Sequence, residues 1–220
     1  MKGDAEASAS DMPPRLPDAE SFESLVRWRR DVRRFQTDPV PAETLSHLLG
    51  IADLAPSVGN SQPWRIVEVV SPALRSAARE NFARANAAAA DGYEGERRAH
   101  YQLLKLAGFD TAPVHLAVLC DPDPAQGHGL GRQTQPLTLD YSCAGFITTL
   151  WLAARTQGLG VGWVSILDPE AFTRALDVPP AWRFVGYLLL GYPEAEHIEP
   201  ELARLGWQAR TPCSGRRFVR

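Results

Sequence analysis

The sequence contains little cysteine: Cys120, Cys143 and Cys213 are the only three in 220 residues. Three widely spaced thiols support neither a disulfide framework nor a CxxC metal site. They are typical of a protein in a reducing compartment, so we expect a cytoplasmic location. The five histidines include no HxxxH or HExxH pair, and the sequence therefore predicts no bound metal.

The chain also lacks a strong excess of charge and lacks a long apolar run. It has 23 Lys and Arg against 26 Asp and Glu, so no general basic field is available to hold nucleic acid. No apolar stretch approaches the roughly 20 residues that span a bilayer. We therefore expect neither nucleic acid nor a membrane as a partner. Hydrophobic residues make up 45% of the chain, which is enough to build a core.

The two ends of the chain have little core pattern. Residues 1–20 are rich in Ala, Asp, Pro and Ser and lack an apolar centre, so they resemble a disordered tail rather than a signal peptide. Residues 193–220 have a polar composition. We expect a single domain over 21–220 with an extended C-terminal segment from about 193.

Periodicity and turn residues predict a mixture of helices and strands. Pro41 is expected at the first position of the helix 41–52, and Pro56 is expected to stop that helix. The helix 141–157 is expected to be buried on all sides, in the core or against another subunit. Strands and helices do not alternate regularly, so the prediction is an α+β fold. The predicted helices cover 21–30, 41–52, 73–90, 94–106, 141–157 and 169–176; the predicted strands cover 65–70, 114–120, 160–167 and 184–190; residues 121–136 are predicted to be a loop.

Two polar segments near the N-terminus carry candidate chemistry. Residues 29–35 read RRDVRRF, and residues 55–65 read APSVGNSQPWR. Arginine holds phosphate bidentately, and the loop from Ser57 to Gln62 offers backbone N–H groups and amides for the edge of a polar ring. Because one short helix joins the two segments, the loop is able to return to the arginine cluster, and the combination suits a flavin. Taken separately, the arginine cluster also fits a solvated helix end, and the loop also fits an ordinary helix-to-strand connection.

Other motifs are weaker. Residues 127–131, GHGLG, follow a strand but open no helix, so they do not fit a dinucleotide fingerprint. Residues 158–162, GLGVG, end a helix and begin a strand, where Gly158 is expected as a cap and Gly162 allows close approach to a ligand. Ser165 is a polar residue in a predicted apolar strand, where most serines are satisfied core hydroxyls.

Together these segments resemble the nitroreductase-like FMN family over most of residues 22–192. The matching pieces are Arg29-Arg30-x-Val32-Arg33, the 55–64 loop, Ala112-Pro113 and residues 158–163. Within that family the segments are most similar to the flavin-fragmenting 5,6-dimethylbenzimidazole synthases. That match rests on Asp31 within residues 30–33, where ordinary nitroreductases usually have Ser in place of the acid, and on residues 55–59, 150–155 and 160–166. Residues 200–203 and 206–207 extend it towards the C-terminus. Asn60-Ser61 is a departure, since related enzymes can carry bulkier apolar residues there.

The resemblance implies a nitroreductase-like fold, with a central mixed, mostly antiparallel sheet flanked by helices and an interlocked homodimer whose two active sites each use both chains. It implies that FMNH2 is consumed as substrate with O2, without a metal, to give 5,6-dimethylbenzimidazole and erythrose 4-phosphate. A separate NAD(P)H-dependent flavin reductase would supply FMNH2. Asp31 would be the catalytic base, and Ser165 would act at the reactive edge of the flavin. The implied flavin contacts are Arg29, Arg30, Asp31, Val32, Arg33, Ser57, Val58, Asn60, Gln62, Gly162 and Ser165.

Two alternatives stay open at this point. The first is a conventional FMN-dependent nitroreductase or NAD(P)H:flavin oxidoreductase, in which FMN remains bound; Asp31 argues against it. The second is a non-catalytic flavin-binding protein, which would bind FMN tightly and form no new product.

Overall fold

A computed structural model describes residues 18–103 and 108–220. Residues 1–17 of the predicted tail and residues 104–106 of the predicted helix 94–106 lie outside the described residues. The first helix begins at Ala19, within the predicted tail, because the Asp18 carboxylate caps it by accepting the Ser21 N–H at 2.8 Å.

The six predicted helices are present close to their predicted ranges, whereas two short helices, at residues 108–111 and 201–204, were not predicted. Pro41 is the N-cap of its helix and not its first residue, and that helix ends at Ala52, before Pro56. The helices are α1 (Ala19–Trp28), α2 (Ala42–Ala52), α3 (Pro72–Ala90), α4 (Gly95–Leu103), α5 (Gly108–Thr111), α6 (Thr138–Thr156), α7 (Pro169–Ala175) and α8 (Glu201–Arg204), with the short 3-10 turns η2 (Val58–Asn60) and η3 (Cys213–Arg216).

Four strands form one sheet in the order β1-β2-β4-β3, and each neighbouring pair is antiparallel. A parallel bridge between Asp31 and Val161 adds the segment after α1 to the edge at β3. The predicted mostly antiparallel sheet is confirmed. The strands are β1 (Trp64–Glu68), β2 (Val114–Cys120), β3 (Gly160–Val164) and β4 (Arg183–Gly191).

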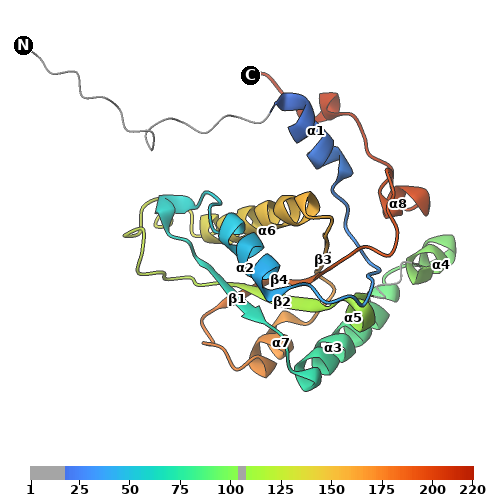
Figure 1. Ribbon diagram of the computed structural model, residues 1–220, viewed down its shortest axis with the longest axis horizontal. Coiled ribbons are helices and arrows are strands. Elements are labelled where there is room, and N and C mark those ends of the chain that lie inside the picture. Colours follow the sequence, from blue (N-terminus) through green and yellow to red (C-terminus); the bar gives the residue numbers. More distant parts are fainter. Residues whose placement is uncertain (1–17, 104–107) are drawn as a thin grey trace, which may run out of the picture.

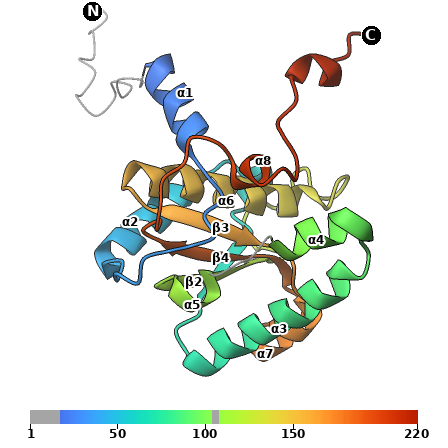
Figure 2. The same cartoon turned by 90° about the vertical axis from the view of Figure 1, so that its right-hand side faces the viewer.

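Helices cover both faces of the sheet, with α2 and α6 on one side and α3 and α7 on the other (Figures 1 and 2). Strand β2 is buried at every position because successive side chains alternate between the two cores. Leu116 and Val118 point into the core under α2 and α6, whereas Ala117 and Leu119 belong to the core on the α3 and α7 side. The α+β prediction with flanking helices is confirmed.

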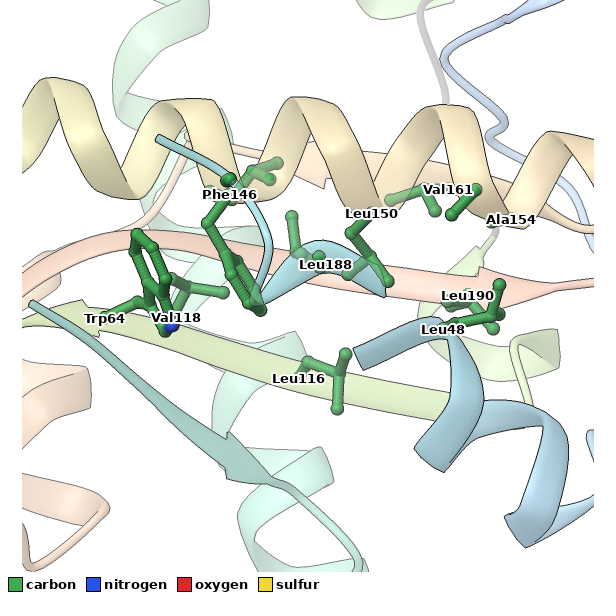
Figure 3. Close-up of a cluster of buried hydrophobic side chains, with 14 of the residues drawn as sticks. Leu48, Trp64, Leu116, Val118, Phe146, Leu150, Ala154, Val161, Leu188 and Leu190 are labelled. Carbon is green, nitrogen blue, oxygen red and sulfur yellow. The ribbon is translucent and has the colours of Figure 1, made fainter. Parts of the chain in front are cut away.

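The core under α6 fixes that helix on the sheet (Figure 3). Phe146 stacks on Trp64 of β1 with ring centroids 5.1 Å apart, and Leu150 is fully buried. Each buried side chain of this size contributes about 1.5–3 kcal/mol. Within one chain the helix is not covered on all sides, since Tyr141 is 57% exposed and Thr148 is exposed. Its burial against another subunit stays a prediction.

Strand β3 is shorter than predicted. It ends at Val164, so Ser165 lies just beyond the strand and its side chain is exposed. The interpretation of Ser165 as a residue within an apolar strand is therefore wrong. Among the described residues, no helix is both long and apolar enough to cross a membrane.

Candidate active site

The arginine-rich segment after α1 lies against the edge strand β3. Its Val32 N–H donates to the Val161 carbonyl at 3.0 Å. A Cβ atom on Gly162 would lie 2.2 Å from the Val32 carbonyl oxygen, and one on Gly160 would lie 2.4 Å from Val32 Cγ2. The glycines at 160 and 162 therefore let the backbone of residues 31–33 approach β3. Gly162 was expected to allow close approach to a ligand, but the group that approaches it is the Val32 backbone of the same chain.

This approach places the Asp31 carboxylate between two donors. Its Oδ1 accepts the backbone N–H of Trp163 at 3.1 Å, and its Oδ2 lies 3.4 Å from Arg33 Nε. The Asp31 side chain keeps 40% of its area exposed, whereas the Arg33 side chain keeps only 12%. Asp31 is thus held in a fixed orientation with one side open to a ligand.

The surroundings act on the pKa of Asp31 in opposite directions. Desolvation by the packed segment raises the pKa of Asp31 above its ordinary value, and this effect is the largest. The Trp163 N–H and the guanidinium groups of Arg33 and Arg29 favour the ionised form and offset part of the rise. The result is a carboxylate that accepts a proton more readily than an ordinary aspartate.

The four arginines of the cluster do different things. Arg30 donates to the backbone carbonyls of Arg29, His197 and Ile198, so its guanidinium holds the C-terminal segment. Arg34 pairs with Glu201, with Nη1 and Oε2 3.6 Å apart. The charges of Arg33 and Arg29 lower the pKa of the Asp31 carboxyl.

A tryptophan on α6 packs against the arginine cluster. Trp151 Nε1 donates to the Arg30 carbonyl at 2.9 Å, and the Arg29 guanidinium carbon lies 4.7 Å from the Trp151 ring centroid. Cation–π contact of this kind fixes the arginine while its charge is retained. Sequence reasoning assigned Trp151 no role in the site, because on its own it reads as one more apolar residue of a buried helix.

A cavity of about 360 Å³ opens beside Asp31. Its volume is within the range of small-molecule sites. Sequence reasoning missed the wall contributed by the C-terminal segment, including Gln208 and Arg210, because a polar stretch without periodicity gives no signal for its position. The lining residues are Arg29, Arg30, Asp31, Arg33, Pro200, Glu201, Leu202, Gln208, Ala209 and Arg210.

The polar loop after α2 has a tightly determined backbone. Val58 N–H donates to Ser142 Oγ on α6 at 3.1 Å, and Gln62 N–H donates to Ser57 Oγ at 3.0 Å. Asn60 N–H donates to the Ser57 carbonyl. Several of the N–H groups that were expected to face a ring are therefore used inside the protein.

The loop and the arginine cluster line separate cavities: Ser61 and Gln62 line one, whereas Arg29, Asp31 and Arg33 line another. The loop contacts α6 at Ser142, and the arginine segment contacts α6 at Trp151. Nine residues of helix separate these two positions by roughly 14 Å. The expectation that the loop returns to the arginine cluster does not hold in the single chain.

Neither Gly162 nor Ser165 lines the cavity beside Asp31, but both lie close in sequence to Trp163, whose N–H binds Asp31. Gly162 packs on Val32, and Ser165 follows Trp163 by two residues, so the strand that binds Asp31 also leads to the serine. Among the described residues, no group of three or more His, Cys, Asp and Glu side chains could hold a metal ion.

Comparison with solved structures shows which fold this geometry belongs to. A crystal structure of oxidised iodotyrosine deiodinase bound to FMN and 3-iodo-L-tyrosine is similar with a TM-score of 0.70, covering 90% of this chain and 97% of that chain. Its sequence is 23% identical, so this likeness shows the fold.

Comparison of sequences gives nearer relatives. The chain is 55% identical over 193 residues to a 5,6-dimethylbenzimidazole synthase of Rhodospirillum rubrum, covering 88% of this chain and 92% of the relative. It is 49% identical over 198 residues to a protein of the same name from Rhodobacter capsulatus, covering 90% and 96%. The model of the nitroreductase family matches residues 26–192. The chain therefore belongs to the nitroreductase family.

Proposed function

We propose that this protein converts FMNH2 and O2 into 5,6-dimethylbenzimidazole, erythrose 4-phosphate and the oxidised remainder of the flavin's pyrimidine ring. The observation that carries the proposal is the oriented Asp31 carboxylate, which lines a cavity beside Arg29 and Arg33. Relatives with this activity in their names, at 46–55% identity over most of the chain, support it.

The residues present suit a reduced flavin phosphate. Arg29, Arg33 and Arg210 line one cavity and supply donors for a dianionic phosphate. The half-exposed Asp31 lies in the same cavity without blocking it. When bound, the reduced flavin itself supplies the electrons that activate oxygen, so the chain needs no metal for that step.

Asp31 acts as a base in this proposal. Erythrose 4-phosphate has one carbon fewer than the ribityl chain, so the chain is cut after its first carbon, which stays with the ring. This cut requires removal of a proton beside the ring, and a carboxylate held by Trp163 and Arg33 is oriented to accept it. The raised pKa of Asp31 improves proton acceptance, provided the group is ionised at the working pH. Ser165, exposed beyond β3, donates or accepts a hydrogen bond at the reactive edge.

The active unit in this proposal is a homodimer with composite sites. The loop contacts, at Ser57, Val58 and Asn60, flavin held by the arginine cluster of the partner, which explains the separation of loop and cluster within one chain. The Gln62 side chain has partners inside the protein and takes no part in this contact. Apolar surface on the side of α6 and on α1 supports a partner, since Tyr141 is 57% and Phe22 55% exposed. Helix α1 and the C-terminal segment both project from the body (Figure 2).

Mixed dimers test the composite site. Arg33→Ala and Asn60→Ala chains are each expected to form defective homodimers. A mixed dimer of the two contains one site with both changes and one site with neither, so it should regain about half of the wild-type activity per dimer. Mixed dimers as inactive as both parents would contradict a site shared between chains.

The proposal also includes the source of the reduced flavin and the compartment in which the protein works. A separate NAD(P)H-dependent flavin reductase provides FMNH2. The three free cysteines, two of them buried, fit a reducing cytoplasm.

One experiment separates this function from its alternatives. Protein is mixed with chemically reduced FMN in air, and 5,6-dimethylbenzimidazole is measured by mass spectrometry. A nitroreductase or flavin oxidoreductase would instead consume NAD(P)H by itself while FMN stays intact. A non-catalytic flavin-binding protein would bind FMN and yield no product. Absence of the benzimidazole under these conditions would overturn the proposal.

A further inference from the structure

Two loops from distant parts of the chain interlock beside the start of α6. One is the loop of residues 57–62, and the other is the glycine-rich loop of residues 126–131. A Cβ atom on Gly127 would lie 2.8 Å from Ser61 Cβ, and one on Gly131 would lie 2.7 Å from Val58 Cγ2. Each distance is too short for a real side chain, so the packing requires glycine at both positions.

Hydrogen bonds join the same two loops. The Gln126 side-chain Nε2 donates to the Asn60 carbonyl and, at 2.8 Å, to Gln62 Oε1. Gln62 Nε2 in turn donates to Asp53 Oδ2 at 3.1 Å, and Asp53 Oδ1 accepts Trp64 Nε1 at 2.7 Å. Because both ends of the Gln62 amide have partners, its side chain is held within the protein and is not free to bind a ring.

The loop of residues 57–62 needs such support. Asn60 and Gln62 have φ angles of +53° and +42°, in the left-handed region that side chains rarely adopt. Such conformations persist where the surroundings hold them and are frequent at ligand sites. The surrounding atoms here are those of the 126–131 loop and of Asp53.

We propose that Gln126 and Gly131 are positioning residues for the flavin. They hold residues 57–60 in the backbone conformation that contacts the flavin, and they do so without touching it. The inference rests on the proposed function, because the flavin contact of this loop is part of that proposal. It also gives Gly127 and Gly131 a role, since they allow one loop to pack on the other.

The test compares Gln126→Ala and Gly131→Ala with two matched controls. Gln135→Ala removes an exposed glutamine nine residues from the first change. Gly158→Ala introduces the same left-handed strain, since Gly158 has a φ of +72° against +78° for Gly131, but no atom lies within 4 Å of its Cβ position. The second control therefore separates backbone strain from contact with Val58.

Three quantities are measured on the full-length protein. These are the Kd for FMN from fluorescence quenching, the absorption spectrum of bound FMN, and the fraction of FMNH2 converted to benzimidazole at saturating FMNH2. Both test variants are expected to raise the Kd about 3–10-fold, the scale of one hydrogen bond. They should also shift the spectrum of bound FMN and divert reduced flavin to plain FMN and peroxide. Both controls should match the wild type in all three.

The outcomes decide the inference independently of the reaction. Test variants with wild-type Kd, spectrum and product fraction overturn it, as do test variants that only lower the melting temperature. If Gly131→Ala does not fold, Gln126→Ala and Asp53→Asn test the same inference by the same three measurements. Asp53→Asn retains an acceptor for Trp64 Nε1. If the wild type makes no benzimidazole, the proposed function fails, and the Kd and spectrum still test the loop.

Discussion

The carboxylate of Asp31 accepts a hydrogen bond from the backbone N–H of Trp163, a residue 132 positions further along the chain, at 3.1 Å. The bond joins the segment after α1 to the edge strand β3, where the bridge between Asp31 and Val161 also forms. The backbone itself orients the carboxylate, so its orientation does not depend on a flexible neighbour.

Asp31→Asn should abolish most of the chemistry and retain binding. Asparagine keeps the Oδ1 acceptor for the Trp163 N–H but cannot take up a proton. We expect product formation to fall by roughly 10²–10⁴-fold, the usual contribution of a general base. Reduced FMN should still be oxidised by air to FMN. Benzimidazole yield at the wild-type rate would show that Asp31 has a structural role only.

The pH dependence of product formation should report the ionisation of Asp31. A base works only when ionised, so the rate falls as pH drops through the pKa of Asp31, which lies above the ordinary value of 3.8. Removing the Arg33 charge removes an interaction that lowers this pKa. The acidic limb of the profile should therefore move to higher pH in Arg33→Met. An unchanged limb would assign the titration to another group.

Arg33→Ala should distinguish phosphate from ring contacts. We expect FMN binding to weaken by about 1.5–3 kcal/mol if Arg33 holds the phosphate through a charge-assisted bond. Riboflavin, which has no phosphate, should lose much less. Arg27→Ala is the matched control, because Arg27 is exposed and pairs with Glu23 on α1. Titration calorimetry with both ligands measures the difference. Equal losses of affinity for FMN and riboflavin would mean that Arg33 is structural or contacts the ring and not the phosphate.

His115 should make the protein less stable in acid. It is buried on β2, with Nδ1 2.8 Å from Tyr187 Oη and Nε2 3.1 Å from the Ala112 carbonyl. Burial lowers the pKa of His115 from 6.5 to about 4. The unfolded chain therefore binds more protons in that window, and stability is lost as pH falls from 6.5 towards about 4, by about 3 kcal/mol in total.

The control for this effect is His115→Gln, which removes the titration and keeps a polar side chain. Urea unfolding of both proteins across the window gives the difference. A slope against pH that is the same in His115→Gln and the wild type would contradict the assignment.

Two glycine substitutions should have opposite effects on stability. Gly162→Ala puts a methyl group 2.2 Å from the Val32 carbonyl oxygen, and we expect a loss of about 1–3 kcal/mol from overpacking. Gly50→Ala, inside α2 with nothing within 4 Å, should gain about 0.5–1 kcal/mol from helix propensity. Thermal unfolding compares the two. A neutral Gly162→Ala would mean that the Val32 segment moves freely away from β3.

Local features of the sequence were sufficient for most of the helices and strands and for singling out Asp31 as a candidate. The apolar spacing of α2 and the β-branched runs of the strands depend on residues close in the chain, so they are readable without a fold. The resemblance to the nitroreductase-like FMN family is also carried by short stretches, namely the segment around Asp31 and residues 158–166, so it is readable without a fold. The end of β3 was missed because nothing local at Ser165 marks where pairing with β4 stops.

Tertiary structure alone decided what surrounds those residues. It brought Trp163 to Asp31, committed Arg30 to the carbonyls of His197 and Ile198, and placed Arg210 in the same cavity. It also set the polar loop and the arginine cluster at opposite ends of α6. Side-chain spacing determines which face of an element is apolar, but the partner of each face depends on how the sheet and helices pack, and that packing is a property of the whole chain.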